Sequence, residues 1–255
     1  MTQIIAVTNQ KGGVGKTTTA VNLAAALAGM KKRVLLIDLD PQGHATMGSG
    51  VDKYQLEHGS VLEVLMGDIS AYNAILTSDF DYDLLPGNGD LTVAEVDLLQ
   101  HERHERSLSD AIAPVVGDYD VVLIDCPPSL NMLTVNALTA STGVLIPLQC
   151  EFYALEGLSA LLDTVEQIRD TVNPHLNVNG IVRTMYDSRI MLTRDVSKQL
   201  SDHFGDVLLK TAIPRNVRVA EAPSHGMPIM RYAKLSRGAH AYRVLAKELV
   251  KRLGL

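Results

Sequence analysis

The chain has 255 residues, of which 46% are hydrophobic and 20% charged, and its formal net charge is −6 at pH 7. This length supports one sizeable hydrophobic core, so we expect a single domain over residues 1–255. No apolar run approaches the roughly 18 residues of a membrane span, and the chain enters a strand directly instead of a charged and apolar leader. These features predict a cytoplasmic protein without a secretory signal or stable membrane insertion.

The negative net charge conceals an uneven distribution. Residues 1–182 hold 9 Lys and Arg against 23 Asp and Glu, a balance of −14, whereas residues 183–255 hold 14 against 6, a balance of +8. Such asymmetry indicates a surface that binds polyanions, although a charged surface is more commonly just a solvated one.

The first predicted elements are a strand over residues 4–7 and a helix over residues 19–28. They are joined by the glycine-rich segment Lys11-Gly12-Gly13-Val14-Gly15-Lys16-Thr17-Thr18. Glycines let several backbone N–H groups face one point, and the positive end of the following helix adds to the attraction, so the segment suits a phosphate chain. Lys16 would then reach the β- and γ-phosphates of a nucleotide, and Thr17 would place its hydroxyl on Mg²⁺. A glycine-rich turn with two solvated lysines is the alternative.

The glycine-rich segment departs from the usual phosphate-loop pattern. The pattern G-x-x-x-x-G-K-[ST] is not met, because its first position falls on Gln10, and Lys11 is an additional lysine. This departure is informative, because it restricts the class of phosphate loop to which the segment can belong.

Two predicted strands end in acids. Residues 33–38 form an apolar run that ends at Asp38, and a turn containing Asp40 follows. Residues 119–125 repeat the scheme and end at Asp125 before two prolines. Because ligands of open α/β sheets bind at the carboxyl edge, these acids are expected beside the glycine-rich segment. Asp125 fits the second acid of a P-loop NTPase, which holds the Mg²⁺ shell, and a structural turn or cap acid is the alternative.

Residues 51–110 are acidic, with 13 acids against 3 bases. Helices are predicted at residues 60–66 and 92–110, around a short strand at residues 82–86. We interpret this region as a solvated flank of the sheet.

Strands and helices alternate over the rest of the chain. We predict strands at residues 143–148, 178–184 and 207–213, and helices at residues 155–172, 192–204 and 237–253. This alternation predicts an α/β fold: a doubly wound, mostly parallel sheet with helices on both faces, of the P-loop NTPase type.

The two cysteines, Cys126 and Cys150, each follow an apolar run. In a chain without export signals this favours reduced, buried thiols over a disulfide. Two cysteines are too few for a metal or iron–sulfur site within one chain.

The glycine-rich segment and the two acidic turns resemble those of ParA/Soj-type chromosome or plasmid partition ATPases. Their deviant phosphate loop, K-G-G-x-G-K-[ST], is shared across the ParA/MinD group. The stretches at residues 149–157 and 213–226 also match the family. The resemblance runs from end to end and is weakest over residues 51–110.

The resemblance implies a Mg²⁺-dependent ATPase, with ATP and Mg²⁺ as cofactors. It places Lys11, Gly12, Gly13, Val14, Gly15, Lys16, Thr17 and Thr18 on the nucleotide, with Thr17 and Asp125 at the metal. Met185, Pro214 and Asn216 would enclose the base. Asp40 would position the attacking water, and Lys11 would reach the partner subunit's nucleotide across a dimer interface. Phosphoryl transfer depends chiefly on positioning and charge neutralisation, which these residue types can supply. An ordinary core role is the alternative for Met185.

The resemblance also implies an ATP-dependent homodimer that binds double-stranded DNA without sequence preference. The DNA-binding face would lie within residues 183–255 and include Arg189 and Arg218. A ParB-type centromere-binding protein would stimulate hydrolysis, and the protein would associate with the nucleoid. Sequence-independent affinity of this kind comes from Lys and Arg that neutralise phosphates, and a dimer doubles the contacts. For Arg218, a structural ion pair with a residue such as Glu221 is the alternative.

Two other classes of protein share parts of this pattern. A MinD-like membrane-surface ATPase that positions the division site would use a basic amphipathic C-terminal helix, and residues 242–253 are basic and amphipathic. They contain no Trp or Phe, however, and their apolar positions are typical of a docked helix. A reductase-type iron protein would need cysteine ligands for a cluster at the dimer axis. Neither cysteine fits that role, since Cys126 directly follows the predicted magnesium acid.

Overall fold

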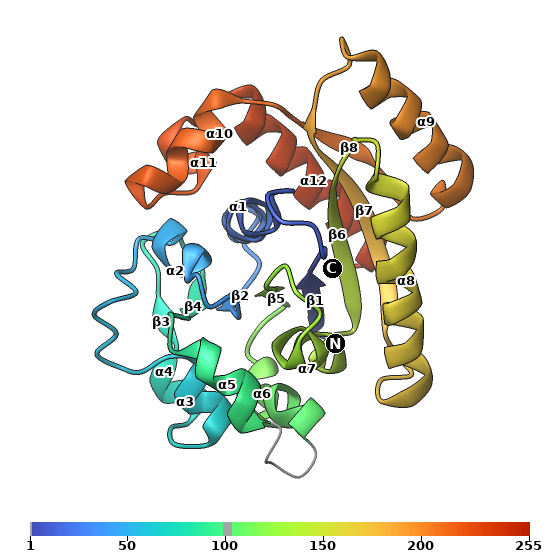
Figure 1. The fold of residues 1–255 in the computed structure, drawn as a ribbon. Coiled ribbons are helices and arrows are strands. Elements are labelled where there is room, and N and C mark those ends of the chain that lie inside the picture. The colour runs from blue at the N-terminus through green and yellow to red at the C-terminus, as the bar shows by residue number, and fades with distance from the viewer. Residues whose placement is uncertain (1, 99–103) are drawn as a thin grey trace.

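The computed structural model describes residues 2–98 and 104–255, which form one eight-stranded sheet with helices on both faces (Figure 1). The strands are β1 (Gln3–Val7), β2 (Val34–Asp38), β3 (Leu76–Thr77), β4 (Asp83–Leu85), β5 (Val121–Asp125), β6 (Gly143–Gln149), β7 (Asn177–Tyr186) and β8 (Leu208–Pro214). The helices are α1 (Lys16–Ala28), α2 (His44–Gly48), α3 (Val61–Met66), α4 (Ala71–Ala74), α5 (Leu91–Asp97), α6 (Ser107–Val116), α7 (Met132–Ala140), α8 (Ala154–Thr171), α9 (Met191–Phe204), α10 (Val217–Glu221), α11 (Ile229–Tyr232) and α12 (Arg237–Leu253). Two short 3₁₀ turns are η2 (His104–Arg106) and η3 (Ala222–His225).

The strand order is β3-β4-β2-β5-β1-β6-β7-β8, and every pairing is parallel except the short β3–β4 hairpin. This order confirms the predicted doubly wound, mostly parallel sheet. The register places Val7 and Asp38 opposite Asp125 on the two sides of β5. The ends of β1, β2 and β5 therefore meet at one point of the carboxyl edge, where ligands bind in such sheets.

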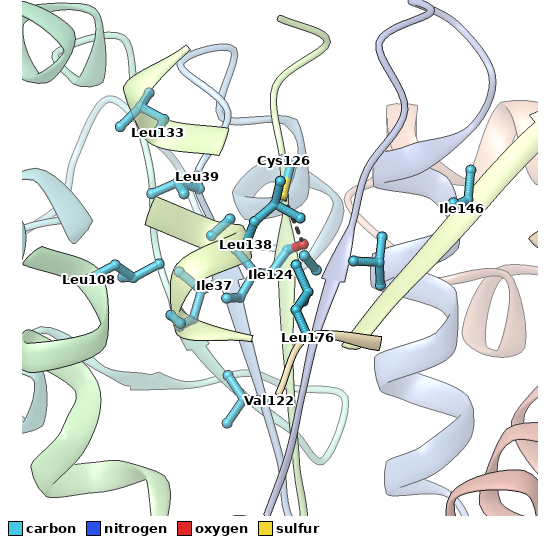
Figure 2. Close-up of a cluster of buried hydrophobic side chains, with 14 of the residues drawn as sticks. Ile37, Leu39, Leu108, Val122, Ile124, Cys126, Leu133, Leu138, Ile146 and Leu176 are labelled. Atoms are coloured by element: carbon cyan, nitrogen blue, oxygen red, sulfur yellow. Dashed lines mark hydrogen bonds between the residues drawn. The ribbon is translucent and has the colours of Figure 1, made fainter. Parts of the chain in front are cut away.

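Two hydrophobic cores lie on the two faces of the sheet. Side chains of β2 alternate between them: Leu35 and Ile37 belong to one core, and Val34 and Leu36 to the other. Helices α3 to α9 cover the first face, and α1, α11 and α12 cover the second (Figure 1). Figure 2 shows strand side chains of the first core, such as Ile124, beside those of α6 and α7. Strands buried on both faces explain the continuous apolar runs in the sequence.

Both cysteines are free, and both are buried, as predicted. Cys126 belongs to the first core, where its Sγ lies 3.7 Å from the backbone oxygen of Ile124 (Figure 2).

Most predicted elements agree with the structure to within one or two residues, but the helix expected over residues 92–110 is wrong. Helix α5 ends at Asp97, and α6 begins at Ser107 and continues to Val116. Residues 99–103, on which the middle of the prediction falls, lie outside the described residues. Helix α6 contains Pro114, whose missing backbone N–H removes one intrahelical hydrogen bond, and the helix ends two residues later at Val116.

The C-terminal helix α12 is docked on the sheet. Its apolar face, including Tyr242, Leu245 and Leu249, is buried in the second core. Its Glu248 carboxylate accepts the backbone N–H groups of Lys210 and Thr211 on edge strand β8, at 2.7 and 2.9 Å. Among the described residues, every helix is too short or too polar to cross a lipid bilayer.

Candidate functional site

The glycine-rich segment forms a loop between β1 and α1, as predicted. Gly13 and Gly15 have φ angles of 74° and 88°, which L side chains rarely adopt, so only glycine fits these two turns without strain. The side chain of Asn9 links the loop to β6. Its Oδ1 accepts the backbone N–H of Lys11 at 2.9 Å, and its Nδ2 donates to the backbone oxygen of Pro147 at 2.8 Å. These two hydrogen bonds tie the start of the loop to β6.

Lys16 is the first residue of α1, and its side chain turns back into the loop. Its Nζ donates to the backbone oxygen of Lys11 at 3.3 Å. Burial lowers the pKa of Lys16, while the nearby charges of Asp125 and Asp40 act in the opposite direction. The structure thus brings together the lysine and the two acids that the sequence predicted to share a site.

Asp125 is a completely buried carboxylate at the centre of this site. Among the described residues, neither of its carboxylate oxygens has a hydrogen-bond partner of ordinary geometry, although the Thr17 hydroxyl lies close enough to favour the charged form. Burial and then the charge of Asp38 raise the pKa of Asp125 well above its ordinary value, although Thr17 and Lys16 act in the opposite direction. A buried carboxylate without partners is costly unless a cation offsets it. Because Thr17 lies next to Asp125, this donor set fits a hard divalent cation such as Mg²⁺.

Asp38 holds the structure around the neighbouring turn. Its Oδ2 accepts both the backbone N–H and the hydroxyl of Thr46 at 2.7 Å, and burial raises the pKa of Asp38 to about 7. The Thr46 hydroxyl in turn accepts the backbone N–H of Gly87 at 2.9 Å. Asp40 is buried on the same turn and accepts the N–H of Gln42 at 2.9 Å through Oδ1. Of the two acids, Asp38 is thus bound to the scaffold through both oxygens, whereas only Oδ1 of Asp40 accepts a hydrogen bond from the described residues.

The residues expected around a nucleotide base lie at the ends of β7 and β8. Met185 has a φ angle of 47°, an uncommon conformation for a methionine, and is half-buried. The next residue, Tyr186, is in register with Pro214. Asn216 caps α10, since its Oδ1 accepts the N–H of Val219 at 3.2 Å. Thr184 joins this region to the glycine-rich loop through a 2.7 Å hydrogen bond to the oxygen of Val14.

The side chain of Lys11 lies at the surface, beside the segment that follows β6. Its Nζ forms an ion pair with Glu151, in the segment after β6, and both side chains are close to half exposed. Beside them, Phe152 and Tyr153 pack edge to face and are largely exposed.

The two arginines expected on the DNA-binding face are both exposed and both paired with a nearby acid. Arg189 donates to the two carboxylate oxygens of Asp187 at 2.9 and 2.6 Å. Arg218 donates to Glu221 at 2.9 Å, the ion pair considered as the alternative for this residue. Exposed pairs of this kind contribute about 0–1 kcal/mol, so either arginine can exchange its acid for another anion.

Sequence reasoning missed four residues that hold the site together: Asn9, Thr46, Thr184 and Glu151. Asn9 follows the first predicted strand, and a polar residue at that position is a signal that could have been used. The other three act through contacts between segments far apart in the chain, which spacing does not reveal.

A glycine-rich loop between a strand and a helix, facing strand-terminal acids at the carboxyl edge of a parallel sheet, defines a P-loop NTPase. A family model described as an AAA domain matches residues 2–178. The sporulation initiation inhibitor protein Soj of Bacillus subtilis is 50% identical over 250 residues, which cover 98% of each chain. The chromosome partitioning protein ParA of Caulobacter vibrioides is 47% identical over 253 residues, covering 98% of this chain and 94% of that protein.

The fold of the chain is also similar to solved structures of related proteins. A Mycobacterium smegmatis protein described as cobyrinic acid a,c-diamide synthase, with bound ADP and magnesium, is 42% identical with a TM-score of 0.87 and covers 100% of this chain and 96% of its own. The cell division ATPase MinD of Pyrococcus furiosus is 28% identical with a TM-score of 0.82, covering 98% and 99%. The chain belongs to the ParA/Soj family of P-loop ATPases.

Proposed function

We propose that the chain is an ATP-dependent DNA-partition protein. It binds ATP with Mg²⁺, dimerises in that state, binds double-stranded DNA without sequence preference, and releases the DNA after hydrolysis to ADP and phosphate. The observation that carries the nucleotide site is Asp125, a buried carboxylate without a hydrogen-bond partner of ordinary geometry among the described residues, which shares the carboxyl edge with Lys16 and the glycine-rich loop. The full-length similarity to Soj and to ParA supports the role in partition.

The nucleotide is assigned to the loop and to the ends of β7 and β8. The phosphates lie on the backbone of residues 12–15 and on Lys16, Thr17 and Thr18, at the positive end of α1. Thr17 and Asp125 hold Mg²⁺, which neutralises charge on the phosphate oxygens. Met185, Pro214 and Asn216 enclose the base, and the Thr184 hydrogen bond keeps this wall fixed to the loop.

Hydrolysis is assigned to Asp40 and the two lysines. One oxygen of Asp40 is held by Gln42, and the other is available to orient the attacking water. Lys16 offsets the charge that develops on the phosphates. Because Lys11 lies at the surface, it is assigned to the nucleotide of the partner subunit in the dimer.

The Lys11→Ala variant tests the assignment across the dimer interface. The exposed ion pair between Lys11 and Glu151 contributes at most about 1 kcal/mol, so the isolated chain changes little in stability when it is removed. We expect near wild-type ATP binding but no ATP-dependent dimer in light scattering. Lys251→Ala, which removes an exposed lysine of α12, should dimerise normally. An ATP-dependent dimer of Lys11→Ala would contradict the assignment.

DNA binding is assigned to the basic surface of residues 183–255, including Arg189 and Arg218. Both arginines are exposed, and their acids contribute too little to hold them against a phosphate. The −14 balance of residues 1–182 repels DNA, so the affinity has to come from this local surface.

The Arg218→Glu variant tests the DNA-binding surface. In each subunit of the dimer the change replaces an attraction to a DNA phosphate by a repulsion, which should cost about 2 kcal/mol or more, roughly a 30-fold loss of affinity. Gel shifts with unrelated duplexes at several salt concentrations measure it. Arg169→Glu is the matched control, because Arg169 forms the same i,i+3 pair with Glu166 on α8. If both variants bind like wild type, residues 183–255 form only a solvated surface.

In this proposal the protein is cytoplasmic and nucleoid-associated, and a ParB-type centromere-binding protein stimulates its hydrolysis. The MinD-like alternative needs a C-terminal helix whose apolar face is free to enter a membrane, but the apolar face of α12 is buried. Co-sedimentation with anionic vesicles and with DNA, both in ATP, separates the two functions: binding to vesicles alone would favour the alternative.

Among the described residues, nothing supports amide synthesis, the activity in the description of the Mycobacterium smegmatis protein. Burial raises the pKa of Cys126, and it raises the pKa of Cys150 to about 11. Neither described cysteine is therefore a reactive thiolate at neutral pH.

A further inference from the structure

Three segments of the basic surface each carry an exposed aliphatic side chain beside an arginine. Met191 follows Arg189 at the start of α9 and is 68% exposed. Val217, at the start of α10, is 71% exposed next to Arg218. Leu235, two residues before Arg237 at the start of α12, is 97% exposed. A leucine that projects so fully into water gains free energy from any partner that covers it.

Leu235 stands at the edge of a large cavity. The cavity has a volume of about 830 Å³ and lies between the segment after β7, the end of β8 and the start of α12. Besides Leu235, its lining includes Asp187, Arg189, Arg215, Arg237 and His240. Two of these segments are joined to each other: the backbone N–H of Arg215, after β8, donates to the backbone oxygen of Tyr186, at the end of β7, at 3.2 Å. The wall that carries Arg215 is therefore held in place.

The lining of this cavity has more positive than negative side chains, which favours an anionic ligand. Asp187 already pairs with Arg189, whereas Arg215 and Arg237 are exposed and form no ion pair within residues 2–98 and 104–255. The charge of Arg215 also acts on Asp187. Three arginines and one acid, Asp187, are thus among the residues that line the same concave space. Neither Arg215 nor Arg237 is among the arginines that the sequence predicted for DNA.

The shape of the surface distinguishes between polyanions. A membrane is flat on this scale and would contact the exposed side chains without filling the cavity. The sugar–phosphate ridge of a duplex is convex and fits a concave basic site, and the minor groove beside that ridge accepts apolar side chains that enter between base steps.

We propose that this cavity receives one sugar–phosphate strand of a DNA duplex, with Arg215 and Arg237 on its phosphates and Leu235 inserted as a wedge into the adjacent minor groove. The inference rests on the proposed DNA-binding function and adds a mode of binding to it. Insertion of the wedge partly unstacks a base step, so the protein deforms DNA and does not merely adsorb to it. Flexible pyrimidine–purine steps are the least costly to deform, and a mild preference for them is expected.

The experiment uses full-length protein in ATP and duplexes that carry 2-aminopurine at TA steps, whose fluorescence rises on unstacking. Binding of the wild-type protein should raise the 2-aminopurine fluorescence. Leu235→Ala should abolish the rise and weaken binding about tenfold, while the slope of log affinity against log salt stays unchanged because every arginine that binds a phosphate is still present. Val93→Ala is the matched control, since Val93 is an exposed aliphatic residue on α5, and it should behave as wild type.

Arg215→Ala and Arg237→Ala should each lower the magnitude of the salt slope, by about one for each phosphate that the arginine neutralises. Salt-dependent DNA binding by wild type without a change in fluorescence would overturn the wedge and leave the proposed function intact. Absence of any DNA binding by wild type would overturn the proposed function itself. Binding of wild type to anionic vesicles that is abolished in Leu235→Ala would assign the surface to a membrane and overturn the wedge.

Discussion

The Lys16→Ala variant is expected to lose ATP binding. Lys16 is buried in the loop with its Nζ against the oxygen of Lys11, so it is already placed where the β- and γ-phosphates are expected. A hydrogen bond to a charged group contributes about 1.5–3 kcal/mol, and the loss of two such bonds would weaken binding by more than about 100-fold. Titration with a fluorescent ATP analogue measures the effect.

The Lys16→Ala result has to be separated from misfolding. Removing Lys16 deletes a buried cation that lies near Asp125 and Asp40. Circular dichroism should therefore show an intact fold, and Lys11→Ala, measured in parallel, should bind ATP nearly as wild type does. Binding of ATP by Lys16→Ala with wild-type affinity would remove the loop from the nucleotide site and with it the whole assignment.

The Asp40→Ala variant is expected to bind ATP without turning it over. It keeps the phosphate contacts but lacks the carboxylate assigned to the attacking water, so hydrolysis should fall by about 100-fold or more. The variant should then accumulate as an ATP-bound dimer that stays on DNA. Phosphate release and DNA dissociation, followed on the same sample, measure both consequences.

The Asp40→Asn variant separates chemistry from structure. Asn keeps an oxygen to accept the N–H of Gln42, so the turn remains, but it lacks the negative charge. Asn should be as slow as Ala if Asp40 acts on the water. Wild-type hydrolysis in either variant would exclude Asp40 and redirect attention to Asp38.

The features that the sequence predicted correctly are those set by local physics. Apolar runs that end in Asp38 and Asp125 predict buried parallel strands, because such strands are covered on both faces. The glycine-rich segment predicts its own turn, because positive φ angles at Gly13 and Gly15 need glycine.

The elements that escaped prediction lack a periodic signal. Helix α7 is buried nearly all round, so its apolar residues mark no single face. Helices α2, α4, α10 and α11 span five residues or fewer and are held by tertiary contacts. The Thr46 and Thr184 hydrogen bonds join segments that only the fold brings together.

The central claim is that ATP converts an acidic chain into a dimer that binds DNA. It is tested most directly by fluorescence anisotropy of unrelated labelled duplexes with wild-type protein, compared without nucleotide, in ADP and in ATP over a series of salt concentrations. We predict binding only in ATP at moderate salt, with affinities that differ little between unrelated duplexes and a linear fall of log affinity with log salt. Equal binding in all three states, or binding that is sequence-specific and insensitive to salt, would contradict the account.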